Sequence, residues 1–243
     1  MLDVRNLAAG YGAHQILWDL SMRVDDGEVV ALLGPNGSGK STLMNSISRL
    51  VDRFAGEILF DGIALHDLPP HRMLRSGLSH VLERHRLFPY MSVLENLQLG
   101  AGPGASKASI ERGLQRAYAL FPRLRDRTRQ MAGSMSGGEQ QMCAIARGLM
   151  AEPRLLLVDE PFIGLSPHMR TEVAQAIRQI NTDGVAVLMI EQNVAAALAM
   201  SQRAYVLREG RIVLAGSSAD LTSGEQLQQA FLGGRATAGV TGH

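Results

Sequence analysis

The stretch 34-GPNGSGKST-42 decides the fold of this chain, because it matches the pattern G-x-x-x-x-G-K-[ST] of a phosphate-binding loop. It follows the continuous apolar run 28-EVVALL-33, which is typical of a strand covered on both faces, and we predict a helix that begins near Lys40. Glycines let backbone N–H groups approach a phosphate closely, and the N-terminus of a helix adds its positive end. The stretch, termed the phosphate loop below, therefore predicts an α/β protein that binds a nucleotide.

Two side chains of the phosphate loop are predicted to carry its chemistry. Lys40 would reach the β and γ phosphates of the nucleotide, and the hydroxyl group of Ser41 would bind Mg²⁺. The alternative is a glycine-rich turn between a strand and a helix that binds no ligand. A second motif favours the nucleotide site.

That motif is 155-LLLVDEP-161, an apolar run followed by two carboxylates. The run predicts a central strand, and open α/β sheets bind their ligands at the carboxyl ends of their strands. Asp159 would hold Mg²⁺, directly or through water, and Glu160 would polarise an attacking water molecule. An Asp-Glu pair alone also fits a solvated strand end, but together with the phosphate loop it predicts a P-loop protein.

A second glycine-containing stretch, 134-SMSGGEQQM-142, is termed the second loop below. Ser136 and Glu139 have the S-x-x-E spacing of a capping box, which predicts that a helix begins at Ser136. Gly137 and Gly138 would occupy its first turn, where glycine costs about 1 kcal/mol relative to alanine. An anion close to the bare N–H groups explains this choice, and a flexible helix start explains it equally well.

Composition indicates a globular chain. The 243 residues are 46% hydrophobic, carry a formal net charge of +1 and include one cysteine, Cys143, which we expect to be a buried hydrophobic residue. This charge gives no reason to expect nucleic acid as a partner. The apolar runs are far shorter than the roughly 20 residues that span a bilayer, and no charged-then-apolar leader opens the chain. We expect a soluble protein that is not exported.

Hydrophobic periodicity predicts one domain over residues 1–233. Its core and N-terminal β region comprise 1–91 and 151–233, with strands at 2–7, 15–24, 28–33, 57–62, 155–160 and 185–192, a helix at about 168–181 and a hairpin at 205–214. Residues 92–150 predict an inserted helical subdomain, which begins at a Ser92–Glu95 capping box. Residues 234–243 have almost nothing to bury and are expected to be a disordered tail. The fold class is thus a P-loop NTPase with a mainly parallel sheet.

The order of these motifs resembles that of ABC-type ATPases over about residues 2–233. S-G-G-E-Q in the second loop is similar to the signature motif of that family, and the strand that ends in D-E-P is similar to its Walker B segment. In detail the chain is most similar to the second ATPase subunit of branched-chain amino-acid importers. The features that carry this similarity are Glu83, 87-LFP-89, 140-QQMCAIARGLM-150, Pro167, 191-EQN-193 and 231-FLG-233.

The resemblance implies ATP and Mg²⁺ as cofactors. The residues it assigns to ATP are Tyr11, which would stack on adenine, and Gly34, Pro35, Asn36, Gly37, Ser38, Gly39, Lys40, Ser41 and Thr42. It assigns catalysis to Glu160, Lys40 and Gln192, and Mg²⁺ binding to Ser41, Glu83 and Asp159. In the family the signature loop, here Ser136, Gly137, Gly138 and Glu139, closes over the γ-phosphate of ATP bound to a second subunit.

The resemblance also implies partners and a location. These are a homo- or heterodimer with a second ABC ATPase, transmembrane permease subunits, indirectly a periplasmic solute-binding protein, and no nucleic acid. The chain would lie as a peripheral subunit on the cytoplasmic face of the inner membrane, where ATP hydrolysis powers import of a small polar solute such as a branched-chain amino acid. The alternative is a non-transport ABC ATPase that acts on ribosomes or DNA.

Four positions depart from the usual pattern of the family. Glu83 replaces Gln, and a carboxylate keeps or strengthens a contact with Mg²⁺. Gln192 replaces His, and an amide does not titrate near neutral pH, so we expect slower hydrolysis than in a His-bearing relative. Ser166 replaces Asp in the loop after Walker B and leaves the contact of that loop across a dimer open. Phe162 stands where a small residue is common, and the sequence offers no account of it.

Overall fold

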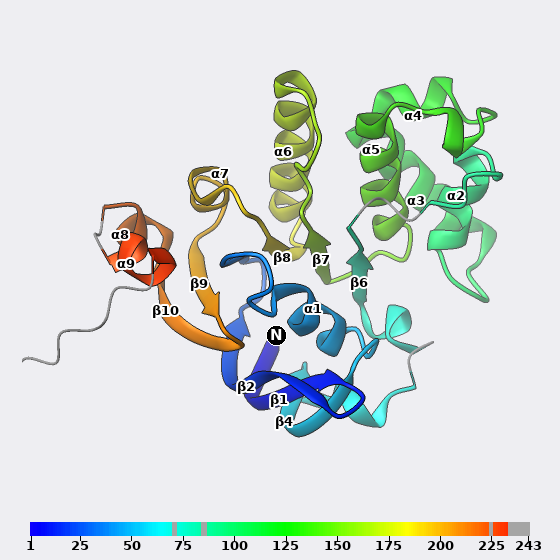
Figure 1. Ribbon diagram of the computed structural model, residues 1–243. Helices are drawn as coiled ribbons and strands as arrows, with labels where there is room; N and C mark the ends of the chain where they lie inside the picture. Colours follow the sequence, from blue (N-terminus) through cyan, green and yellow to red (C-terminus); the bar gives the residue numbers. More distant parts are fainter. Residues whose placement is uncertain (70–71, 84–86, 224–225, 233–243) are drawn as a thin grey trace, which may run out of the picture.

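The computed structural model describes residues 1–69, 72–83, 87–223 and 226–232 (Figure 1). Within them the strands form two sheets. The smaller sheet has the order β2-β1-β4-β5 and is antiparallel; its strands are β1 (Leu2–Tyr11), β2 (His14–Val24), β4 (Asp52–Phe60) and β5 (Ile63–Ala64). The larger sheet has the order β10-β9-β3-β8-β7-β6; its strands are β3 (Val29–Leu33), β6 (Leu78–Val81), β7 (Leu155–Asp159), β8 (Ala186–Ile190), β9 (Arg203–Arg208) and β10 (Arg211–Ser217).

The larger sheet is parallel except for the hairpin of β9 and β10. Its middle strand, β3, is buried at every position, as its unbroken apolar run predicts. Val30 and Leu32 join the core between the two sheets, whereas Ala31 and Leu33 join the core on the other face. The central strand therefore divides two hydrophobic cores, and the predicted mainly parallel sheet is confirmed.

Helix α1 (Lys40–Ile47) follows β3 and packs between the two sheets. Leu43, Met44 and Ile47 are fully buried there. Figure 1 shows the helix at the centre of the molecule, between the antiparallel strands and the larger sheet. The helix that begins at Lys40 is thus fixed from both sides.

Four helices form a group beside β6 and β7 (Figure 1). They are α2 (Val93–Gly100), α3 (Lys107–Leu120), α4 (Pro122–Asp126) and α5 (Gly137–Leu149). Leu114 and Ala117 of α3 are buried in the same core as Leu156 of β7. The group therefore shares one hydrophobic core with the parallel sheet.

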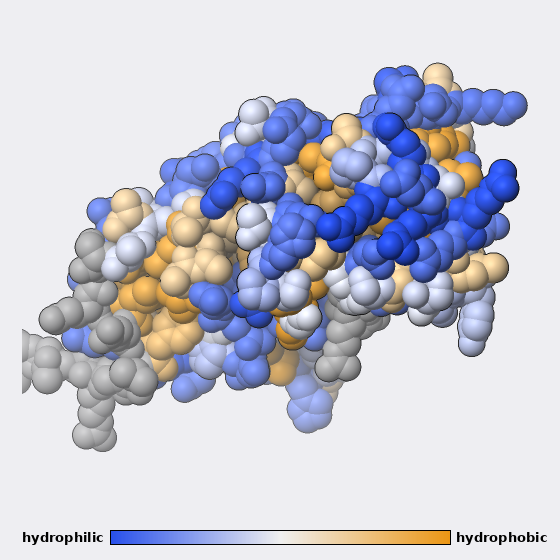
Figure 2. Space-filling model, turned by 90° about the horizontal axis from the view of Figure 1, so that it is seen from above, coloured by the Kyte–Doolittle hydropathy of each residue, from blue (hydrophilic) through white to orange (hydrophobic). Residues whose placement is uncertain are grey.

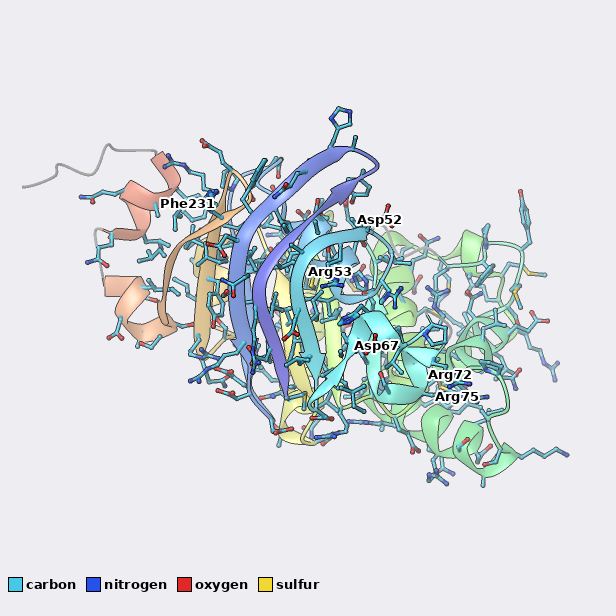
Figure 3. All side chains as sticks on the ribbon, turned by 90° about the horizontal axis from the view of Figure 1, so that it is seen from below. Asp52, Arg53, Asp67, Arg72, Arg75 and Phe231 are labelled. Atoms are coloured by element: carbon cyan, nitrogen blue, oxygen red, sulfur yellow. The ribbon has the colours of Figure 1, made fainter. Side chains whose placement is uncertain are left out.

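The remaining helices flank the larger sheet or lie in connections. They are α6 (Pro167–Thr182), α7 (Val194–Leu198), α8 (Ser218–Ser223), α9 (Gln226–Leu232) and the 3₁₀ turns η1 (Leu65–Asp67), η3 (Leu74–Ser76) and η4 (Ala132–Ser134). In the view from below (Figure 3), Arg75 of η3 lies beside the helical group and Phe231 of α9 lies at the opposite end of the molecule. Arg75 donates a hydrogen bond to the carbonyl oxygen of Pro103 over 2.8 Å, which ties η3 to the loop after α2.

Strands β5 and β6 were not predicted, and two further details differ from the sequence predictions. Strand β4 begins at Asp52, before the predicted Glu57, because it continues past an irregularity in its pairing with β1. The short helices α8 and α9 follow β10 where no helix was predicted. The predicted tail lies outside the described residues. Within the described ranges, no helix combines the length and the apolar character needed to cross a membrane.

Candidate functional site

The phosphate loop joins β3 to α1, and its conformation requires glycine. Gly34, Gly37 and Gly39 have φ values of 150°, 77° and 106°. A Cβ atom on Gly34 would lie 2.1 Å from the carbonyl oxygen of Leu207, and one on Gly39 would lie 2.8 Å from Cδ2 of Leu17. Backbone conformation and close packing thus both exclude side chains at Gly34 and Gly39.

Lys40 is the first residue of α1, and its side chain is buried. Its Nζ atom donates hydrogen bonds to the carbonyl oxygens of Gly34 over 2.8 Å and Pro35 over 2.9 Å. Burial lowers the pKa of Lys40, while the charges of Glu160 and Asp159 raise it. The ammonium group therefore lies within the curve of the loop, where it can bind phosphate oxygens.

A cavity of about 530 Å³ lies against the phosphate loop. It brings together segments that are far apart in the sequence; its lining residues are Ile16, Asn36, Gly37, Gly39, Lys40, Ser41, Thr42, Glu83, Glu160, Ile163 and Gln192. Of the residues predicted to bind this chain's own ATP and Mg²⁺, Tyr11, Gly34, Pro35, Ser38 and Asp159 are absent from that lining. The structure thus gathers most of the predicted loop with Glu83, Glu160 and Gln192 around one space.

Tyr11 lies outside the lining of this cavity, whereas Ile16 and Ile163 belong to it. Tyr11 ends β1 with its side chain half exposed, and its hydroxyl group accepts a hydrogen bond from Nδ2 of Asn45 over 3.4 Å. Ile16 and Ile163 line the cavity, but the sequence analysis missed both of them. Isoleucine carries no chemical motif, and only the exposure of Ile163, at 45%, marks it as unusual.

Asp159, at the end of β7, has the environment expected of a cation ligand. Its side chain is 5% exposed, and its Oδ1 atom has no hydrogen-bond partner among the described residues. Burial, together with the charges of Glu83 and Glu160, raises the pKa of Asp159 to about 6, although a hydrogen bond with Ser41 and the charge of Lys40 oppose this rise. An unpartnered buried carboxylate oxygen beside a hydroxyl and a second carboxylate suits a divalent cation.

The described residues contain no group of three His, Cys, Asp or Glu side chains placed to hold a metal ion. Mg²⁺ in nucleotide sites takes one or two carboxylates and completes its shell with phosphates and water. The residues present therefore fit a nucleotide-bound Mg²⁺ and not a cage made by protein alone.

Glu160 and Gln192 face each other at the mouth of the cavity. The Nε2 atom of Gln192 donates a hydrogen bond to Oε1 of Glu160 over 2.6 Å. Glu160 has a φ of 48°, which is rare for residues other than glycine, and its backbone N–H donates to the carbonyl oxygen of Ile190 over 3.1 Å. The Glu160 carboxylate is therefore held by its backbone and by Gln192, which leaves one oxygen available to a water molecule.

The second loop has the predicted helix start. Ser136 caps α5: its hydroxyl group accepts a hydrogen bond from the backbone of Glu139, and the Glu139 carboxylate accepts from the backbone of Ser136 over 3.0 Å. Glu139 is buried and forms an ion pair with Arg127 over 3.0 Å. Burial raises the pKa of Glu139, but the hydrogen bonds from Ser136 and the charge of Arg127 outweigh it, so the pKa lies below its usual value. The carboxylate of Glu139 thus caps the N-terminus of α5.

The two glycines of the second loop have different surroundings. A Cβ atom on Gly137 would meet nothing within 4 Å, whereas one on Gly138 would lie 2.4 Å from Cε of Met169 on α6. A side chain at Gly138 would therefore force Met169 to move, whereas Gly137 keeps a bare N–H on an open face. Neither residue lines the cavity at the phosphate loop.

The structure accounts for the residues that the sequence left unexplained. Phe162 is buried, and its backbone N–H donates to the Glu191 carboxylate over 3.3 Å. The hydroxyl group of Ser166 caps α6 by accepting a hydrogen bond from the backbone of Met169 over 3.4 Å. Cys143 is fully buried, and burial raises the pKa of its thiol to about 12, which confirms it as a structural residue.

Comparison with known proteins relates this site to a family. A family model described as "ABC transporter" matches residues 17–163. The chain is 41% identical over 234 residues to BraG of Pseudomonas aeruginosa, a high-affinity branched-chain amino acid transport ATP-binding protein; the match covers 96% of this chain and 100% of BraG. It is 33% identical to the lipopolysaccharide export system ATP-binding protein LptB of Escherichia coli K12, over 96% of this chain and 97% of LptB.

The fold is also similar to solved structures. One is the dimeric, post-hydrolysis ATP-binding cassette MJ0796 bound to ADP and Pi, with a TM-score of 0.77 and 26% identity, which covers 90% of this chain and 99% of that cassette. The similarity therefore extends over the phosphate loop, the helical group and the second loop together.

Proposed function

The chain belongs to the ABC transporter family, and from this premise we propose that it powers the import of branched-chain amino acids. It is an ATP-binding subunit of an ABC transporter and an ATPase. One observation carries the proposed site: a single cavity joins Lys40 of the phosphate loop to the hydrogen-bonded pair Glu160 and Gln192. Phosphate-binding and water-activating groups thus share one space, as hydrolysis of ATP requires.

The proposed roles follow from this arrangement. Lys40 and the N–H groups of the phosphate loop bind the β and γ phosphates, and exposed Tyr11 stacks on adenine. Ser41, Asp159 and Glu83 would hold Mg²⁺, which supplies positive charge to the phosphate oxygens. One carboxylate oxygen of Glu160 accepts a hydrogen bond from the attacking water. Gln192 donates to the other oxygen, Oε1, and so fixes the orientation of the carboxylate.

The second loop is proposed to complete the site of a partner. ABC ATPase cassettes act as dimers. The open Gly137 at the start of α5 lies outside the lining of the chain's own cavity, yet its N–H is free to meet an anion. We therefore propose that Ser136 and Gly137 contact the γ-phosphate of ATP held by the phosphate loop of a second cassette, which is this chain or a related subunit.

A groove on another face is the proposed contact with the permease. ABC ATPases associate with transmembrane permease subunits. The groove, about 430 Å³, lies between the parallel sheet and the helical group, and Leu50, Phe88 and Leu99 line it with half-exposed apolar side chains. Tyr90, beside it, is 93% exposed. An apolar groove of this kind fits a helix from a permease loop, which would place the chain as a peripheral subunit on the cytoplasmic side of a membrane.

The transported solute is proposed from similarity alone, because it is recognised by other subunits. The identity of 41% to BraG favours branched-chain amino acids over lipopolysaccharide, for which LptB offers 33%. A periplasmic solute-binding protein and two permeases are then expected partners.

The test is affinity purification of the tagged chain from detergent-solubilised membranes, followed by reconstitution and uptake assays. Co-purified permeases and ATP-dependent uptake of labelled leucine support the proposal. Co-purification with lipopolysaccharide-export proteins would indicate that the transported solute is lipopolysaccharide. Recovery of ribosomes or DNA instead of permeases would overturn the proposal that the chain serves a transporter. A Lys40→Ala variant is the control, because it must abolish uptake without changing the proteins recovered.

A further inference from the structure

The start of α5 and the start of α6 are in direct contact. Met169, in the first turn of α6, fills the space left by the missing side chain of Gly138, with its Cε 2.4 Å and its Cγ 3.1 Å from the position of a Cβ atom there. Figure 1 shows the two helices side by side. A shift of the second loop toward α6 would therefore require Met169 to move.

An arginine from a third helix closes this contact. Arg123, on α4, lies with one guanidinium nitrogen 4.0 Å from Sδ of Met169 and another 3.3 Å from Oε1 of Glu172 on α6. The same Oε1 lies 3.0 Å from Nε2 of His168. Arg123 therefore spans from the helical group to the first turns of α6.

The neighbouring arginine reaches the other side of the contact. Arg127 pairs with Glu139, whose carboxylate caps α5 together with Ser136. Seen from above (Figure 2), polar and charged side chains gather over the helical group that carries these residues. Two arginines one turn apart thus connect the carboxylate of the second loop and the carboxylate of α6.

These ion pairs contribute little to the stability of the fold. The side chains of Arg123 and Glu172 are 49% and 28% exposed, and pairs at such a surface are worth about 0–1 kcal/mol. Their geometry matters more, because groups that bind a reacting phosphate must be held within about 0.5 Å. Helix α6 begins just after the loop that follows Glu160. The contact between Gly138 and Met169 therefore links the second loop to the segment that carries Glu160.

We propose that Arg123, Met169 and Glu172 are positioning residues that hold the second loop in the orientation in which it contacts the partner's ATP. The proposal rests on the head-to-tail dimer of the proposed function. It requires that these residues act on hydrolysis at the partner's phosphate loop and leave hydrolysis at the phosphate loop of their own chain intact.

The test uses dimers of the full chain in which two differently tagged copies are purified through both tags. One copy carries Glu160→Gln, so that only one phosphate loop hydrolyses ATP. Arg123→Gln is then placed either in the Glu160→Gln copy or in the other copy. In the first arrangement the active site uses the altered second loop, and ATP hydrolysis is expected to fall about two- to fivefold. In the second arrangement the rate is expected to equal that of the dimer without Arg123→Gln.

Three further variants complete the test. Glu172→Gln is expected to repeat the asymmetry, and Arg112→Gln is the matched control, since Arg112 forms a similar exposed pair with Glu152 within 3.0 Å but does not touch α6. ATP binding to the isolated Arg123→Gln chain is expected to be unchanged, which shows that it folds. Ser136→Ala tests the head-to-tail dimer itself, because it is expected to lower ATP hydrolysis only when it is placed in the Glu160→Gln copy.

The outcomes separate the two proposals. Asymmetry for Ser136→Ala together with equal rates in both arrangements of Arg123→Gln overturns the positioning role alone. Loss of rate in both arrangements of Arg123→Gln assigns it a general structural role and equally overturns the proposal. If Ser136→Ala shows no asymmetry, the head-to-tail dimer itself fails.

Discussion

The phosphate loop and the second loop both place glycines at the start of a helix, yet their glycines are there for different reasons. In the phosphate loop, Gly34 and Gly39 have positive φ values and lie against Leu207 and Leu17, so the chain itself requires them. In the second loop, Gly137 has no positive φ and no neighbour within 4 Å of a Cβ position. A glycine that nothing in its own chain requires suggests that its neighbour belongs to another molecule.

The two loops also differ in what surrounds them. The phosphate loop shares a cavity with Glu160 and Gln192, so its chemistry is assembled within one chain. The second loop has a capping box, in which Ser136 and Glu139 hydrogen-bond to each other, and it lies outside the lining of that cavity. The surroundings of the first loop thus fit a binding site within one chain, and those of the second loop fit the proposed contact with a second cassette.

The largest expected effect separates binding from hydrolysis at the first loop. Glu160→Gln keeps the size of the side chain but removes its ability to accept a proton, so hydrolysis is expected to fall about 10²–10⁴-fold while ATP still binds. The measurement is ATP turnover beside ATP affinity, with gel filtration to follow the dimer, which is expected to persist in ATP. Glu152→Gln, an exposed carboxylate outside the cavity, is the control. Full turnover in Glu160→Gln would show that another group activates water.

A pair of glycine variants tests the comparison directly. Gly34→Ala places a Cβ atom 2.1 Å from a backbone carbonyl, so we expect the free energy of unfolding to fall by roughly 3 kcal/mol and ATP binding to be lost. Gly137→Ala is expected to leave the fold intact or to stabilise α5 by up to about 1 kcal/mol, while hydrolysis by the dimer falls. Thermal melts and ATPase assays measure both. Should Gly137→Ala keep full activity, the second loop has no close partner.

The pH dependence of stability is expected to reveal how Asp159 is held. Burial raises its pKa to about 6 in the folded chain, whereas the unfolded carboxyl ionises near 3.8, so the folded state retains the proton longer. Without metal, this term lowers stability as pH rises from about 4 to above 6, and the full penalty is present at pH 7. Asp159→Asn removes it, and the melting temperature in EDTA is expected to rise by several degrees at pH 7 and not at pH 4.

A bound cation would neutralise the Asp159 carboxylate and remove this penalty. With Mg²⁺ and ATP, the unmodified chain is therefore expected to melt at a higher temperature than Asp159→Asn. The unmodified chain should then gain more thermal stability than Asp159→Asn. An equal gain in both chains would remove Asp159 from the metal site.

Local signals predicted most of the fold and most of the candidate site. Short runs of neighbouring residues predict the buried strand β3, the helix start at Lys40 and the two capping boxes. The structure contains all of them. What escaped prediction depends on contacts between distant residues. Met169 against Gly138, and the backbone of Phe162 on Glu191, become visible only when separate elements pack.

The same reason explains the cavity residues that were missed. Ile16 comes from the antiparallel sheet and Ile163 from the loop after β7, and neither has a motif. Apolar side chains enter a nucleotide site through the topology of the fold, which a single sequence does not encode locally.

The smallest expected effect concerns Gln192, which completes the first loop in an unusual way. Its Nε2 atom donates one hydrogen bond to Glu160 over 2.6 Å, and the second N–H lies on the same nitrogen, so the amide has no separate nitrogen on its far side with which to reach the γ-phosphate. In Gln192→His one imidazole nitrogen can keep the bond to Glu160 while the other binds phosphate, so turnover of the assembled complex is expected to rise about two- to tenfold. The rate should also gain a dependence on pH near 6.5, the ordinary pKa of histidine. Gln192→Asn, which is too short to reach Glu160, is the control and should lower the rate. If Gln192→His leaves turnover unchanged or lower, the amide is already the better partner for Glu160, and the first loop needs no histidine to be complete.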